Sequence, residues 1–84
     1  MKVFTIDFTT FTKGASLISH DSGESPKSLG NSTRPLDEFL SFSRNTGKPG
    51  LVIVKHFKED NNAELIKTQL RTRGYNVQEF IVGG

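Results

Sequence analysis

Serine, histidine and aspartate side chains stand next to one another in the run Ser19-His20-Asp21-Ser22. These are the residue types of a hydrolytic triad, in which a histidine takes the proton of a serine nucleophile and an acid orients the histidine. A triad is assembled by the fold through specific mutual hydrogen bonds, whereas adjacent side chains of an extended segment point apart. We therefore interpret this run as a polar turn without catalytic residues.

Nucleotide and metal motifs are incomplete. Gly47-Lys48-Pro49 resembles the end of a phosphate-binding loop, but Pro49 stands where Ser or Thr is required, and Phe42 stands where the first Gly is required. The two histidines, His20 and His56, lack the close pairing that marks a zinc site. We expect no metal, no cofactor and no enzymatic activity.

Composition limits the class of protein further. The chain has 84 residues and no cysteine, so it has neither disulfides nor thiolate metal sites. Residues 1–47 have no net charge and residues 48–84 carry +2, a bias far short of the basic stripe of a dedicated nucleic-acid binder. No segment approaches the roughly 18 apolar residues of a membrane span, and the N-terminus lacks a signal-type apolar run. We expect a cytoplasmic protein with no membrane contact.

The elements that would position any site follow from hydrophobic periodicity. Alternation predicts a strand over residues 3–10 and a weaker return strand over 15–19. A helix is predicted with Pro35 in its first turn, and a second helix is predicted over 60–73. The continuous apolar run 51–54 predicts a strand buried on both faces, and 75–82 predicts another. The predicted fold is a single α/β domain, residues 1–84, with the order β(β)αβαβ. It has a sheet of three to four strands, two helices and a parallel βαβ unit over 51–82.

Residues 19–35 form a serine-rich segment in which Leu29 is the only aliphatic or aromatic side chain. Nothing in this composition offsets the entropy of ordering the backbone, so we expect a flexible loop within the domain. Such a loop is a candidate contact surface that becomes ordered on binding.

Several side chains outside this loop also suit partner contact. Leu65 projects away from the apolar arc of the second predicted helix, and Phe42 lies at the margin of the first. The basic residues of the second half of the chain could add an electrostatic surface. The predicted partner-binding residues are Leu65, Phe42, Leu29, Lys58, Lys67 and Arg71.

The expected function is that of a small non-enzymatic protein that binds another protein as an accessory or inhibitory factor, of the kind that phages encode. Nucleic-acid binding through the dispersed Lys and Arg residues is the first alternative. The second alternative comes from Phe80-Ile81-Val82-Gly83-Gly84, which resembles the terminus of ubiquitin-like sulfur carriers and modifiers. That resemblance implies a terminal carboxylate that is activated, although the predicted 60–73 helix departs from the β-grasp fold.

Overall fold

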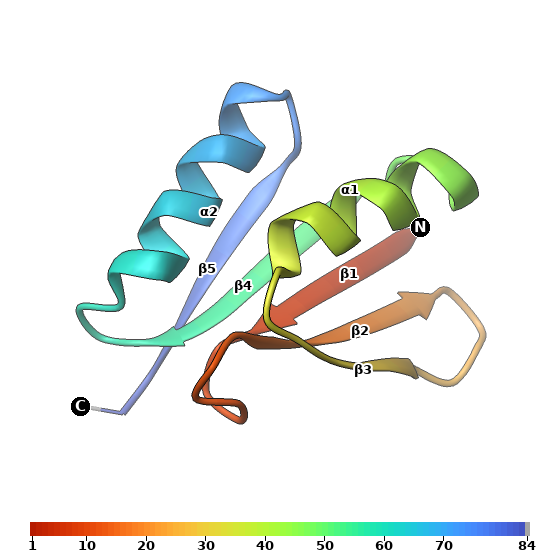
Figure 1. The fold of residues 1–84 in the computed structure, drawn as a ribbon. Coiled ribbons are helices and arrows are strands. Elements are labelled where there is room, and N and C mark those ends of the chain that lie inside the picture. Colours follow the sequence, from red (N-terminus) through yellow and green to blue (C-terminus); the bar gives the residue numbers. More distant parts are fainter. Residues whose placement is uncertain (84) are drawn as a thin grey trace.

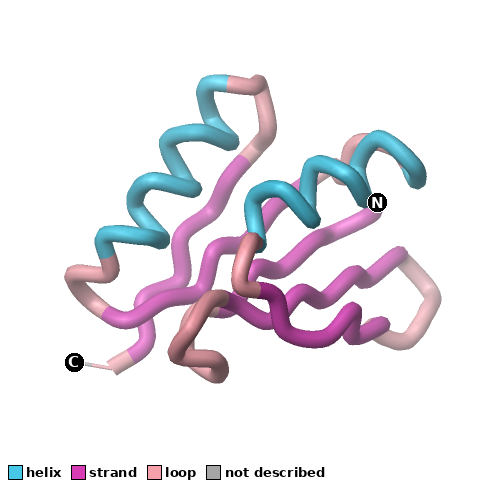
Figure 2. Tube along the Cα trace, in the orientation of Figure 1, coloured by secondary structure: helices cyan, strands magenta, loops and turns pink. Residues whose placement is uncertain are grey.

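The chain forms one mixed β-sheet with two helices on the same face (Figures 1 and 2). The computed structural model describes residues 1–83. In chain order the elements are β1 (Lys2–Asp7), β2 (Ala15–Asp21), β3 (Lys27–Ser32), α1 (Pro35–Thr46), β4 (Leu51–Phe57), α2 (Asn61–Thr72) and β5 (Val77–Val82). The strand order across the sheet is β3-β2-β1-β4-β5. Strand β2 is antiparallel to both of its neighbours, and β1, β4 and β5 run parallel.

The predicted α/β class, with two helices, is confirmed, and β4, α2 and β5 form a parallel βαβ unit. The predicted number of strands is wrong, because the sheet has five rather than three to four.

The additional strand, β3, lies inside the 19–35 segment that the composition predicted to be a loop. It pairs with β2 through Ala15 opposite Ser32 and Ser16 opposite Asn31, with a register shift between Leu17 and Ile18. All of its side chains except that of Ser32 are exposed. An edge strand of this kind is held by main-chain hydrogen bonds to its neighbour, so it needs no apolar alternation that a sequence pattern could reveal.

The hydrophobic core lies between the sheet and the two helices. Phe4, Ile6 and Phe8 are buried, as their alternation predicts, and the Phe4 ring meets the Phe39 ring of α1 edge to face at 4.8 Å. Phe39 also meets the Tyr75 ring, at 5.1 Å. Edge-to-face pairs at such distances add to the stabilisation that burial of the rings already gives.

The two helices begin differently: α2 has a side-chain N-cap and α1 has none. The Asp60 carboxylate accepts a hydrogen bond from the Ala63 backbone N–H at 3.1 Å, and Asp60 is the N-cap of α2. Gly74 follows α2 with φ of 84°, the left-handed conformation that glycine adopts without strain. Helix α1 begins with Pro35 in its first turn and has no side-chain cap.

The 51–54 run is not buried on both faces, contrary to the prediction. Val52 and Val54 are fully buried under the helices, but Leu51 and Ile53 are only half-buried on the other face. The physical reason is that both helices lie on one face of the sheet (Figure 1). Within residues 1–83, neither helix has the length and apolar composition that crossing a bilayer requires.

Candidate functional site

One face of the sheet is not covered by helices and carries apolar side chains (Figure 1). We call it the open face. Residues paired across neighbouring strands project on the same side, so the register identifies its members. Thr5 pairs with both Ile18 and Ile53, Val3 pairs with Leu51, and Lys55 pairs with Phe80. The apolar members of the open face are Val3, Ile18, Leu51, Ile53, Phe57, Phe80 and Val82.

The two phenylalanines of the open face lie on neighbouring strands near one end of the sheet. Phe57 is 48% exposed and Phe80 is 57% exposed. The Lys55 ammonium lies 5.8 Å from the centre of the Phe80 ring and 3.9 Å from an Asp7 carboxylate oxygen. The charge of Lys55 is thus balanced by Asp7, and the open face carries little net charge.

Two of the predicted contact residues, Leu29 and Phe42, line one groove of about 250 Å³. Its other walls come from β1, β2, the β2–β3 turn and the end of α1. Phe42 is half-buried because its ring packs against Phe4 at 5.1 Å, whereas Leu29 is 42% exposed. The structure therefore joins Leu29, Phe42 and the 19–35 segment, but it makes Phe42 in part a core residue.

Leu65 lies elsewhere, in a second groove of about 370 Å³ between α2 and the start of α1. It is 61% exposed, as its helical position predicted. Pro35, Leu36 and Ile66 supply the apolar walls, and Arg34 and Asp37 lie at the rim.

The predicted basic residues do not form one surface. Lys67 is only 2% exposed, so it is not available to a partner. Lys58 and Arg71 are exposed, but Lys58 precedes α2 and Arg71 lies in its last turn. The helix rises about 15 Å between its first residue and Arg71, at about 1.5 Å per residue. Two carboxylates, Glu64 and Glu79, hold the Lys67 ammonium.

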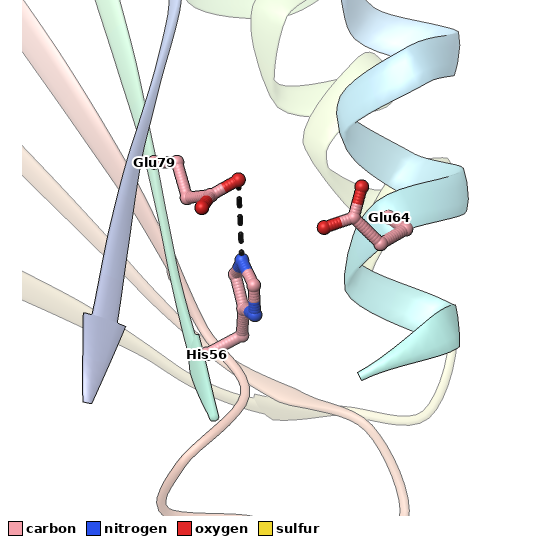
Figure 3. Close-up of side chains that lie close together, drawn as sticks. All are labelled: His56, Glu64 and Glu79. Carbon is pink, nitrogen blue, oxygen red and sulfur yellow. Dashed lines mark ion pairs between the residues drawn. The ribbon is translucent and has the colours of Figure 1, made fainter. Parts of the chain in front are cut away.

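Lys67 belongs to a polar cluster with His56, Glu64 and Glu79, which come from β4, α2 and β5 (Figure 3). Its ammonium donates hydrogen bonds to Glu64, at 2.6 Å, and to Glu79. Burial opposes the charged form of Lys67, but the hydrogen bonds to the two carboxylates outweigh it and raise the pKa of Lys67 above its usual value. The hydrogen bond from Lys67 lowers the pKa of Glu79.

His56 completes the cluster and is 1% exposed. Its Nδ1 lies 2.7 Å from the backbone carbonyl oxygen of Phe57, which can only accept, so Nδ1 carries a proton. Its Nε2 is buried without a hydrogen-bond partner, and a Glu79 carboxylate oxygen lies 3.7 Å from it.

The run Ser19-His20-Asp21 does not assemble a triad. All three residues belong to β2, where alternate side chains project on opposite faces, so His20 points away from Ser19 and Asp21. The terminal Gly83-Gly84 prediction lies partly outside the described residues, because Gly84 is not among them. The carrier function stays a prediction.

The open face and the polar cluster were both missed by sequence analysis. The alternation of half-buried and buried residues in β4 depends on which face the helices cover, and that is a property of the tertiary fold. The spacing Glu64-x-x-Lys67 was a readable signal of a helical ion pair, but nothing in the sequence placed His56 and Glu79 beside it.

Comparison of the chain with protein-family models, with curated proteins and with solved structures gives no match.

Proposed function

We propose that this chain is a non-enzymatic binding protein that docks another protein against the open face of its sheet. The observation that carries the proposal is the exposure of this apolar face. The central contact residues of this surface are Phe57 and Phe80, in place of Leu65 and Phe42, which the sequence had suggested.

Parallel strands are usually covered on both faces, since their side chains are apolar on both. Here β1, β4 and β5 are parallel, and helices cover one face of them. An apolar patch of this kind on a small protein is typical of an interaction site. Exposed aromatic side chains such as Phe57 and Phe80 are also enriched at protein interfaces.

A protein partner fits the open face better than nucleic acid does. Its central side chains, Val3, Ile18, Leu51 and Ile53, are aliphatic and cannot stack on bases. Its one lysine, Lys55, is paired with Asp7. Phosphate binding requires uncompensated positive charge, which this surface lacks.

Single-strand nucleic-acid binding is the second candidate function, and one observation favours it. Phe57 and Phe80 are exposed on adjacent strands of an open sheet, the arrangement by which sheet surfaces stack unpaired bases. In that function Lys55 and Lys58 would contact the phosphates.

The test is capture of partners from a nuclease-treated lysate of the native host. The baits are the wild-type protein, a Phe57→Ser/Phe80→Ser double variant and a Leu65→Ser control. Leu65 is a matched control because it is as exposed as Phe80 and lies on the helical side of the molecule. We expect a protein band that the wild type and Leu65→Ser retain and the double variant loses.

Three results would count against the proposal. A band that depends on Leu65 but not on the phenylalanines would assign binding to the groove beside α2. Loss of every partner with nuclease, together with oligonucleotide affinity that falls steeply with salt, would favour the second candidate. A dimer in light scattering that the double variant abolishes would show that a second copy of this chain covers the face.

A further inference from the structure

The geometry points to a binding site for a divalent transition-metal ion formed by His56, Glu64 and Glu79. Zn²⁺ is the first ion to test. In the metal-free protein the ammonium group of Lys67 holds the two carboxylates together. The site lies on the helical side of the sheet and does not depend on the function proposed for the open face. The lack of a close histidine pair in the sequence predicted no metal, whereas this site combines one histidine with two carboxylates from different elements.

The first support is the state of His56. Its Nε2 is buried, has no hydrogen-bond partner and faces the two carboxylates (Figure 3). A buried nitrogen without a hydrogen-bond partner destabilises the folded protein. The lone pair of Nε2 can be satisfied either by a hydrogen-bond donor or by a metal ion. Metal-bound histidines donate their other ring N–H to a carbonyl or carboxylate, and His56 Nδ1 makes this contact with the Phe57 carbonyl.

The second support is the position of the carboxylates. One ligand atom each from His56, Glu64 and Glu79 lies within 4.8 Å of the others. A zinc ion bonds each ligand at about 2.0–2.2 Å, so the three atoms would have to move closer together on binding. Glu64 can make this movement, because its side chain is 58% exposed, and the same exposure gives the ion a path from solvent.

Lys67 explains how two carboxylates stay close together without a metal. Its ammonium contacts both of them, in the place that a cation between them would take. With the proton of His56 on Nδ1, the cluster sums to −1: two carboxylates and one ammonium. A divalent ion in place of the ammonium would bring the ion and its three ligands to zero, and the flexible lysine stem would carry its charge to the surface.

The donor set selects the class of ion. One imidazole nitrogen and two carboxylate oxygens suit Zn²⁺ and its first-row neighbours, whereas Mg²⁺ and Ca²⁺ prefer oxygen alone. Three protein ligands also leave a position for water, as in open zinc sites.

The test is calorimetric titration of Zn²⁺ into the untagged wild-type protein and the variants Lys67→Met, His56→Gln and His20→Gln. Removing the competing ammonium should tighten Zn²⁺ binding about ten- to hundredfold in Lys67→Met. His56→Gln should weaken it by at least about tenfold. His20→Gln, which removes the other histidine, should leave it unchanged.

A second measurement is independent of whether the variants fold. In wild-type protein, nitrogen-15 NMR of the imidazoles should show that Zn²⁺ shifts the Nε2 signal of His56 and leaves His20 unaffected. The inference is overturned if the His20 signal alone responds, or if Lys67→Met binds Zn²⁺ no more tightly than the wild type does.

Discussion

Replacing Gly14 by alanine tests the least expected element of the fold, strand β3. Gly14 lies in the loop between β1 and β2, and an added Cβ would collide with the backbone carbonyl oxygen of Ser32, the last residue of β3. The same Cβ would lie 2.8 Å from the Ser32 carbonyl carbon and 2.9 Å from Thr33 Cα. All three atoms belong to the backbone, so no side-chain rotation relieves the overlap.

The expected cost is that of overpacking, about 1–3 kcal/mol. With a dependence on urea of about 1 kcal/mol per molar for so small a protein, the midpoint of unfolding should fall by about 1–3 M. The measurement is urea unfolding followed by far-ultraviolet circular dichroism. The slope should stay constant, because one added methyl group hardly changes the surface area that unfolding exposes.

Gly50→Ala is the matched control. Neither Gly14 nor Gly50 has a positive φ, but an added Cβ at Gly50 would overlap only the side chain of Met1, which is 68% exposed and can rotate away; the Lys2 carbonyl oxygen would lie at 3.8 Å, an ordinary contact distance. Its stability should change by less than about 0.5 kcal/mol. Equal midpoints for Gly14→Ala and Gly50→Ala would refute the reasoning, because the Ser32 carbonyl could then not lie against Gly14.

Two further predictions concern the core and the polar cluster. Phe39→Ala should lower the free energy of unfolding by about 3–5 kcal/mol, out of the roughly 4–13 kcal/mol expected for 84 residues, in the same unfolding assay. A loss below about 1 kcal/mol would contradict the packing of Phe39 against Phe4 and Tyr75. Because the folded-state pKa of Glu79 is lowered, its contribution to stability is present above the unfolded pKa of about 4.3 and is lost as the pH falls through the folded pKa. Urea unfolding of the wild type and of Glu79→Gln should therefore give different free energies of unfolding at neutral pH, and this difference should shrink below about pH 4. A difference that persists at the lowest pH would exclude the Glu79 carboxylate as its source.

Local signals in the sequence were enough to predict the strands and helices that pack against the core. The alternation of Phe4, Ile6 and Phe8, the Asp60 cap and the left-handed Gly74 each reflect interactions within a few residues or with the core as a whole. Strand β3 has no such signal in the sequence. It is held by backbone pairing with β2, and its side chains bury little apolar surface. Composition can predict that a segment does not build a core, but it cannot predict that the segment is unpaired.

The candidate sites show the same division. The exposure of Leu65 followed from its angle on one helix. The burial of Lys67 could not follow from such an angle, because Lys67 is held by Glu79 of β5, 12 residues away along the chain. The open face is a property of the whole arrangement, since the sequence does not state that both crossover helices pack on one side.

The position of β1 in the middle of the sheet has a consequence for synthesis of the chain. One edge of β1 pairs with β2, which follows it closely, whereas the other edge pairs with β4, where Val3 meets Leu51, 48 residues later. At about 5–20 residues per second, the ribosome needs roughly 2–10 s to add those residues. In the first part of this interval, before α1 is added, the nascent β1–β3 meander carries Phe4 without the Phe39 ring that packs against it, and throughout the interval one edge of β1 is open to pairing with other chains. The late partner strand thus makes the growing chain, more than the finished protein, the stage at which aggregation or chaperone binding is decided.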